Sequence, residues 1–243
     1  MIQLIYIVIL IYFLLGGLGF YLINRKKEPQ VARESYTKFI SYFFIINILF
    51  FSITIDSFYF RILAGIIIIA GLVELIRLYR QSGLRHTPFF VVSVVIYAAL
   101  ATGLFLFSGL DAKLVLFSFL ILSIFDSFSQ ITGQLWGKIK LFPRVSPQKT
   151  LGGLVGGALI AIASALLLNS LYPGAQKGKA LLMAAGVVAF ALAGDLAASW
   201  YKRRYQVKDY SHLIPGHGGF LDRFDSLIAG GSWVAIWIYL FNL

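Results

Sequence analysis

The chain has 243 residues, of which 59% are hydrophobic and 13% are charged, and it carries a formal net charge of +11. Soluble domains contain roughly 45–50% apolar and about 25% charged residues, so this composition excludes an ordinary soluble fold and a disordered chain. The lack of cysteine excludes disulfides, zinc–thiolate sites, iron–sulfur clusters and a cysteine nucleophile. The positive charge therefore has to be interpreted relative to a membrane.

Apolar windows long enough to span a bilayer, roughly 17–25 residues each, follow one another along the whole chain. The first is not a cleavable signal peptide, because it has no basic start and its apolar run is too long. The predicted fold is an all-α, polytopic membrane bundle of about eight transmembrane helices in a single domain, residues 1–243. The windows are 2–23, 38–55, 58–76, 89–108, 114–133, 151–172, 180–200 and 224–243.

Lysine and arginine residues are distributed unequally between alternate loops. All but four of the 21 lie in the loops after the first, third, fifth and seventh windows, the exceptions being Arg61, Lys113, Lys177 and Lys179. The positive-inside rule then places these odd-numbered loops in the cytoplasm and both termini on the other side. Most of the charge is thus a topology signal, which argues against nucleic acid as a partner. Together with the lack of a targeting signal, it favours a bacterial inner membrane.

Four aspartates, Asp126, Asp195, Asp222 and Asp225, lie in or beside apolar windows, where an isolated charge costs about 3 kcal/mol. Asp222 and Asp225 are three residues apart and share one helix face. Asp195 lies near the cytoplasmic end of its helix, where antiparallel packing could bring it beside them. Carboxylates that converge without thiols or paired histidines suit a hard cation such as Mg²⁺. The alternative for each is a buried hydrogen bond or ion pair that holds two helices together.

Glu74 lies near the end of the 58–76 window. We expect it to have a structural role, paired with Arg77 or Arg61. The other acidic residues lie in loops and need no special explanation.

Two loops have features of phosphate sites. In the first, Ser146 followed by Pro147 is typical of a helix start, with Ser146 as the N-cap. Lys149 and Thr150 would then lie on the first helical turn, beside backbone N–H groups that can bind phosphate. The alternative is a well-capped membrane helix whose lysine only follows the positive-inside rule.

The second loop combines the cations at 202–204 with a Pro-Gly-His-Gly-Gly run at 215–219, and Asp222 follows one turn later. Such a glycine run forces tight turns and exposes backbone N–H groups. Cations, a glycine turn and carboxylates in this order predict a triphosphate site.

Residues 199–225 resemble the signature of the phosphatidate cytidylyltransferases (CDP-diacylglycerol synthases). The resemblance extends over about residues 120–243, and includes Asp195 and the stretch 146–150. The chain departs from the family pattern at Tyr201, where an aliphatic residue is usual, and at Gly152 and Ala198, where the family commonly has glutamates. The matching signature positions are Ser199, Lys202, Arg203, Lys208, Asp209, Pro215, His217, Gly218, Gly219, Asp222, Arg223 and Asp225.

The resemblance implies transfer of a cytidylyl group from CTP to phosphatidic acid or a related lipid phosphate, giving CDP-diacylglycerol and pyrophosphate. It implies that Asp195 and Asp222 hold Mg²⁺, with Asp225 in support and Asp126 as a further candidate ligand. Lys202 and Arg203 would join these aspartates in catalysis. The substrates would be bound by Ser146, Lys149, Thr150, Lys208, His217, Gly218, Gly219 and Arg223.

The resemblance further implies a catalytic half over residues 114–243, with cytoplasmic loops 134–150 and 201–223, preceded by N-terminal helices over 1–113. The expected partners are CTP, the lipid phosphate and membrane lipids, and a homodimer and an additional monovalent cation stay open.

Three alternatives also stay open: a CTP-dependent polyprenol or phytol kinase, an ion-coupled transporter and an inactive homologue. A CDP-alcohol phosphotransferase is disfavoured, because its Asp-Gly-x-x-Ala-Arg pattern is absent.

Overall fold

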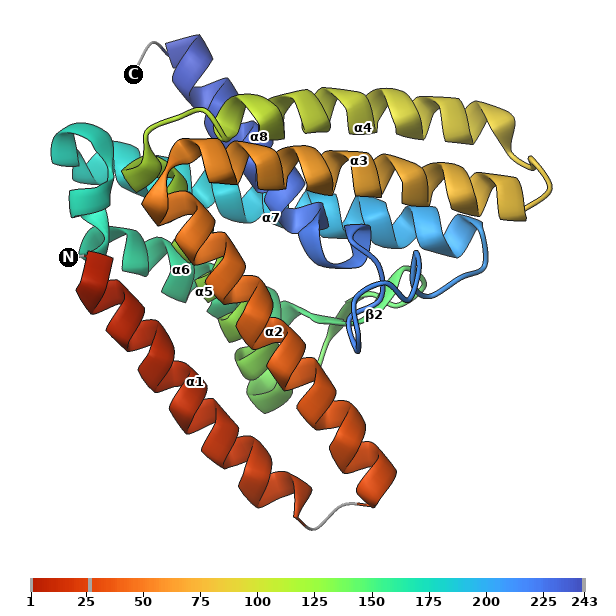
Figure 1. Ribbon diagram of the computed structural model, residues 1–243, viewed down its shortest axis with the longest axis horizontal. Helices are drawn as coiled ribbons and strands as arrows, with labels where there is room; N and C mark the ends of the chain where they lie inside the picture. The colour runs from red at the N-terminus through yellow and green to blue at the C-terminus, as the bar shows by residue number, and fades with distance from the viewer. Residues whose placement is uncertain (1, 26–27, 242–243) are drawn as a thin grey trace.

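The computed structural model describes residues 2–25 and 28–241, and a helix lies in each of the eight predicted windows (Figure 1). The helix ends differ most at α2, which begins at Pro29 rather than at 38. They differ by five residues at α3, which ends at Gln81 rather than at 76, and at α6, which ends at Leu167 rather than at 172. The helices are α1 (Ile2–Asn24), α2 (Pro29–Ile55), α3 (Ser57–Gln81), α4 (Thr87–Phe107), α5 (Ala112–Trp136), α6 (Leu151–Leu167), α7 (Lys177–Arg204) and α8 (Leu221–Phe241).

Within the described ranges, five helices are long and apolar enough to cross a membrane, namely α2, α3, α4, α5 and α7. Shorter apolar stretches occur in α1 and α6. Large apolar side chains face outward on many helices, with Leu14 exposed by 74% and Leu167 by 85%. Soluble proteins rarely expose such extensive apolar surface. The molecule is therefore an α-helical membrane bundle.

Helix α5 forms the centre of the bundle. Every residue from 114 to 122 is buried, as expected for a helix that is apolar on all sides. Helix α6 packs extensively against α5, and α8 packs against α7 and α4. Helices α1 and α2 form a pair that slants away from α3 and α4 (Figure 1). Asp126 lies beyond the buried stretch of α5 and is exposed.

The segment after α5 forms an antiparallel hairpin, where the sequence predicted the start of a helix. Strand β1 (Lys140–Phe142) pairs with strand β2 (Ser146–Thr150). The pairing satisfies backbone groups of β2 in an extended conformation, and Pro147, which has no N–H, is tolerated on an edge strand. The predicted all-α fold thus contains a small two-stranded sheet.

Helix α6 begins at Leu151, so the prediction of Ser146 as its N-cap is wrong. The N-cap is Thr150, whose Oγ1 accepts a hydrogen bond from the Gly153 N–H at 3.1 Å. Thr150 has extended backbone angles, which suit a capping residue. After α6, two 3₁₀ turns (Asn169–Leu171 and Pro173–Ala175) lead into α7.

The segment between α7 and α8 has few regular elements and turns twice through left-handed glycine conformations. Gly216 has φ of +76° and Gly218 has φ of +80°, and Ile214 pairs with Gly218 in a single antiparallel bridge. In Figure 1 this segment lies beside the β hairpin, on the opposite side of the view from the start of α1 and the end of α8. The two predicted phosphate-binding loops thus lie on one side of the bundle.

Candidate functional site

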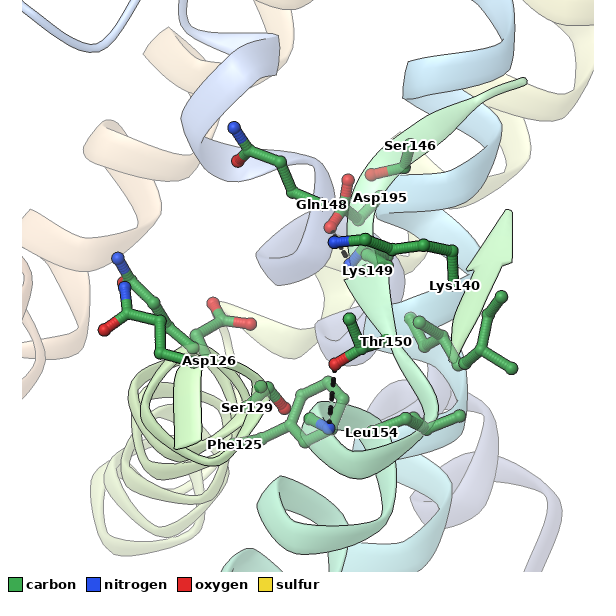
Figure 2. Close-up of a pocket in the computed structure, with 16 residues that line it drawn as sticks. Phe125, Asp126, Ser129, Lys140, Ser146, Gln148, Lys149, Thr150, Leu154 and Asp195 are labelled. Atoms are coloured by element: carbon green, nitrogen blue, oxygen red, sulfur yellow. Dashed lines mark hydrogen bonds and ion pairs between the residues drawn. The ribbon is translucent and has the colours of Figure 1, made fainter. Parts of the chain in front are cut away.

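A cavity of about 760 Å³ opens between α5, the β hairpin, the start of α6 and α7. Its lining includes five of the residues predicted from the sequence: Asp126, Ser146, Lys149, Thr150 and Asp195. Figure 2 shows Asp126 on α5, across the cavity from Lys149 on β2 and Asp195 on α7. Residues far apart in the sequence thus meet in one polar cavity at the edge of an apolar bundle.

Lys149 and Asp195 form an ion pair that joins the hairpin to α7 (Figure 2). Both side chains are partly exposed to the cavity, by 26% and 31%. Asp195 also accepts a hydrogen bond from Ser199 Oγ at 3.3 Å, one helical turn along α7. The sequence predicted both Lys149 and Asp195 as site residues, but it did not predict that they would pair with each other.

Three of the predicted aspartates lie within electrostatic range of one another. Asp225 on α8 is repelled by both Asp195 and Asp126, while Asp126 is attracted by Lys149 and Arg223. One oxygen of Asp225 accepts a hydrogen bond from the Ser226 N–H at 2.6 Å. In the described ranges, no three His, Asp or Glu side chains are grouped closely enough to hold a metal ion by themselves.

Asp222, at the first turn of α8, is held by three donors. Its Oδ1 accepts from Lys202 Nζ at 2.6 Å, and its Oδ2 accepts from the N–H groups of Tyr210 and Gly219 at 2.7 and 2.8 Å. Both side chains of the Asp222–Lys202 pair are buried, with 5% and 11% of their surface exposed. Asp222 therefore fastens the α7–α8 segment at two points.

Arg203, also predicted as catalytic, binds backbone carbonyl groups. Its Nη1 donates to Val207 O at 2.8 Å and its Nε donates to Val145 O at 3.3 Å. The side chain is exposed and links the end of α7 to the turn of the hairpin. These contacts give Arg203 a part in positioning the two loops relative to each other.

The predicted loop residues Lys208, His217, Gly218 and Arg223 line a second cavity of about 440 Å³, as does Asp222. Burial, together with repulsion from Arg223 and Lys38, lowers the pKa of His217 below its usual value. The neutral form of His217 is therefore favoured. Of the predicted site residues, five line the first cavity and five line the second, whereas Asp225, Lys202, Arg203 and Gly219 line neither. The first cavity has two aspartates and two lysines in its lining, and the second has three cations and two aspartates.

The partners predicted for Glu74 on α3 from the sequence were wrong. It is 2% exposed and is not paired with Arg77 or Arg61. Its Oε1 accepts from Ser211 Oγ at 2.6 Å and from the Phe220 N–H at 2.9 Å, and its Oε2 accepts from the Leu221 N–H at 2.8 Å. Free N–H groups at the start of a helix attract a carboxylate, so Glu74 caps α8 from another helix.

Gly219 makes room for this contact, because a Cβ there would lie 2.2 Å from Glu74 Oε1. Of the predicted site residues, Gly219 therefore acts through packing and through its N–H bond to Asp222. Glu74 could be recognised from the sequence as a charged residue inside an apolar window. Its partners could not be predicted, because they are distant in sequence.

Of the two positions where the family commonly has glutamate, Gly152 has a local explanation, whereas nothing in the structure explains the alanine at 198. A Cβ at Gly152 would lie 2.7 Å from the backbone oxygen of Trp136, so the close packing of α6 on the end of α5 excludes a larger residue there. The carbonyl oxygen of Ala198 accepts from Tyr210 Oη at 3.1 Å. This bond gives α7 another contact to the following segment.

The arrangement suits chemistry between phosphate groups. Carboxylates, lysines and arginines converge at the edge of an apolar bundle, and the described residues around the first cavity contain no histidine. Such a site can bind anions and a hard cation.

Comparison with known proteins agrees with the resemblance of residues 199–225. A model of the Cytidylyltransferase family matches residues 89–241, more than half of the chain. The match begins in α4, upstream of residue 120, where the resemblance in sequence began.

Relatives named phosphatidate cytidylyltransferase occur in several bacteria. The protein of Brucella abortus is 41% identical over 130 residues (53% of this chain, 46% of the relative), and that of Staphylococcus epidermidis is 41% identical over 117 residues (48% and 45%). The protein of Rickettsia prowazekii is 29% identical over 218 residues (85% and 94%). The matched part of the chain thus spans about half the length of the first two relatives and nearly all of the third. By the extent of the family match, the chain belongs to the cytidylyltransferase family.

Proposed function

We propose that the chain transfers a cytidylyl group from CTP to phosphatidic acid, giving CDP-diacylglycerol and pyrophosphate. The observation that carries this proposal is the cavity between α5, α7 and the β hairpin, where Asp126 and Asp195 face Lys149 among membrane helices. Membership of the cytidylyltransferase family and relatives named phosphatidate cytidylyltransferase support it.

In this reaction an oxygen of the lipid phosphate attacks the α-phosphorus of CTP. A new phosphorus–oxygen bond forms while the bond between the α- and β-phosphates breaks, and pyrophosphate leaves with the bonding electrons. The attacking oxygen is already anionic near pH 7, so no protein group has to remove a proton. The work of the site is to bring two anions together and to neutralise their charge.

The carboxylates of the site fit a divalent cation. Asp126, Asp195 and Asp225 lie within electrostatic range of one another and offer only oxygen donors, which Mg²⁺ prefers. Asp222 uses three of the roughly four lone-pair positions of a carboxylate on Lys202, Tyr210 and Gly219, so it could contribute one further bond. Within the described residues no three of these carboxylates are close enough to hold an ion by themselves, so the four aspartates would supply only some of its ligands, and phosphate oxygens and water would complete the set. The bound ion would neutralise triphosphate charge.

The basic residues of the first cavity would bind the nucleotide phosphates. Lys149 is already placed against Asp195, and Ser146 lines the same cavity. Thr150 uses its oxygen to cap α6 but keeps a hydroxyl hydrogen to donate. Lys202 would act by fixing Asp222, and Arg203 by fixing the loop that carries Lys208.

The bias of lysine and arginine toward alternate loops supports a cytoplasmic site in a bacterial inner membrane. CTP would then enter from the cytoplasm and the lipid from the bilayer. Residues 114–243 would form the catalytic half of a single membrane domain.

The test uses the purified chain in detergent with Mg²⁺, phosphatidic acid and CTP labelled in either the α- or the γ-phosphate. We expect label from the α-phosphate in CDP-diacylglycerol and label from the γ-phosphate in pyrophosphate. A lipid that carries the γ-label would instead indicate a CTP-dependent lipid kinase. No labelled lipid with any lipid phosphate, alongside an active control synthase, would refute the proposal.

A further inference from the structure

The second cavity, of about 440 Å³, is completed by a helix outside the part of the chain that the family model matches. Lys38 of α2 lines it, facing Lys208 and Arg223 from the α7–α8 segment. The family match begins only at residue 89. In the sequence, Lys38 is one of many loop cations that orient the helices in the membrane. That role does not explain why it lines this cavity.

Lys38 is exposed, but it lies on the face of α2 that packs inward further along the helix. The residues at intervals of four, three and four along the same face are Tyr42, Ile45 and Leu49, and Leu49 is buried at 5% exposure. The lipid-facing side of α2 carries other residues, with Ile40, Phe44 and Ile48 all more than half exposed. A cation that served only to anchor the helix at the membrane surface would not need this orientation.

The glycine turn of the α7–α8 segment lies directly against this face of α2. Ser41 Oγ donates to Pro215 O at 2.8 Å. Gly216 has φ of +76°, and a Cβ there would lie 2.7 Å from Lys38 Cγ. The approach of the turn to Lys38 is therefore close enough to require glycine, and it fixes the lysine stem at the cavity wall.

Tyr42 extends the same contact toward the catalytic segment. The guanidinium of Arg223 lies 4.5 Å from the Tyr42 ring centre, and the His217 ring stacks on Tyr42 with centroids 6.3 Å apart. Arg223 also attracts Asp126 of the first cavity. Arg223 thus stands between the two cavities, which makes them neighbours.

The charges of this cavity are out of balance. Among the described residues, Lys38, Lys208 and Arg223 form no ion pair, since the two ion pairs found there are Lys149–Asp195 and Lys202–Asp222. Asp222 is already neutralised by Lys202, which leaves Asp209 as the acidic group of the lining without a lysine partner. Three cations facing a single free carboxylate create a positive cavity that favours an anion.

We propose that Lys38 completes a phosphate-binding subsite in this cavity, together with Lys208 and Arg223. The inference rests on the proposed function, because it assigns this cavity a phosphate group of that reaction. The phosphate belongs to one of two molecules, the lipid substrate or the pyrophosphate that leaves. In both cases Lys38 contacts the ligand directly, and α2 becomes part of the site.

The kinetic test compares Lys38→Ala and Lys38→Arg with the matched control Arg33→Ala, which removes a cation from an exposed position of the same helix. Loss of a charged hydrogen bond changes affinity about tenfold or more. A rise of this size in KM for phosphatidic acid in Lys38→Ala, with KM for CTP unchanged, identifies the lipid phosphate. A rise in the inhibition constant of pyrophosphate identifies the leaving group. Partial recovery in Lys38→Arg is expected in either case.

Equal kinetic constants for Lys38→Ala and Arg33→Ala would overturn the inference. A binding experiment keeps this result separate from failure of the proposed function. Thermal unfolding is followed without CTP, with either inorganic pyrophosphate or a short-chain phosphatidic acid. We expect one of them to stabilise the wild type and Arg33→Ala but not Lys38→Ala, even if no CDP-lipid is formed. Stabilisation that is equal in all three proteins, or absent from the wild type, refutes the subsite.

Discussion

Asp222 and Lys202 form a buried ion pair, 2.6 Å between Oδ1 and Nζ, that joins the end of α7 to the start of α8. The same carboxylate accepts the N–H groups of Tyr210 and Gly219. Asp222 therefore holds two points of the sixteen residues of irregular backbone between the helices, 205–220. The predicted metal ligand of the signature is also the residue that gives the loop its shape.

Removing Lys202 alone should destabilise the protein more than removing both members of the pair. Lys202→Met leaves the Asp222 charge buried without its partner, which costs about 3–5 kcal/mol. The double variant Lys202→Met/Asp222→Asn removes the unpaired charge, so we expect it to regain part of this stability while staying inactive. Unfolding in detergent and turnover of CTP measure the two effects separately. A double variant less stable than Lys202→Met would contradict this account of the pair.

Glu74 should affect activity although it lies on α3, outside the family match. Glu74→Ala leaves three donors without an acceptor, and we expect a loss of about 1–3 kcal/mol in stability and a lower kcat. Glu74→Gln keeps one acceptor oxygen and should lie between Glu74→Ala and the wild type. Glu34→Ala, on the exposed surface of α2, serves as the control. Equal kcat in Glu74→Ala and Glu34→Ala would show that the cap does not position α8 for catalysis.

Gly152 should be intolerant of any side chain. A Cβ there would meet the Trp136 backbone oxygen at 2.7 Å, and such overpacking costs about 1–3 kcal/mol. We expect Gly152→Ala to lower the unfolding temperature, and Gly152→Glu, which restores the family residue, to lower it further. At Gly178 a Cβ meets nothing within 4 Å, so Gly178→Ala is the matched control. If Gly152→Ala and Gly178→Ala unfold at the same temperature, the close packing of α5 and α6 is not what selects glycine.

Acid should destabilise the protein partly through His217. Its pKa is lowered in the folded state by burial and by the charges of Arg223 and Lys38. A group whose folded pKa is depressed contributes stability above its unfolded pKa, and this stability is lost as the pH falls toward the folded pKa. We expect the wild type to lose more stability than His217→Gln between pH 7 and pH 5. Parallel losses in the two proteins would mean that His217 is not titrated in this way.

The sequence predicted the helices well because each is a long apolar run, and the spacing of these runs is visible without partners. It predicted the residues of the two loops from their composition, but not their interactions. Ser146-Pro147 has the local pattern of a helix start, yet pairing with residues 140–142 holds it in a strand. Thr150 caps the helix instead.

Long-range partners explain the other differences. Glu74 contacts residues more than 130 positions away, so its neighbours in sequence, such as Arg77, gave no indication of its role. In the sequence, nothing distinguishes Lys38 from the other loop cations. Only the fold places the glycine turn against it. Asp195 and Asp222 were expected to share one ion, but each is paired with a different lysine in this structure. Which lysine each aspartate pairs with depends on how the helices pack, and this packing cannot be predicted from a single sequence.

We propose that Asp195 and its neighbours hold a divalent ion against CTP in the first cavity. Binding of Mn²⁺ as a substitute for Mg²⁺, followed by electron paramagnetic resonance with and without CTP, tests it most directly. We expect tight, CTP-dependent binding in the wild type that is lost in Asp195→Asn and retained in Arg33→Ala. Unchanged Mn²⁺ binding in a folded Asp195→Asn variant would contradict the claim.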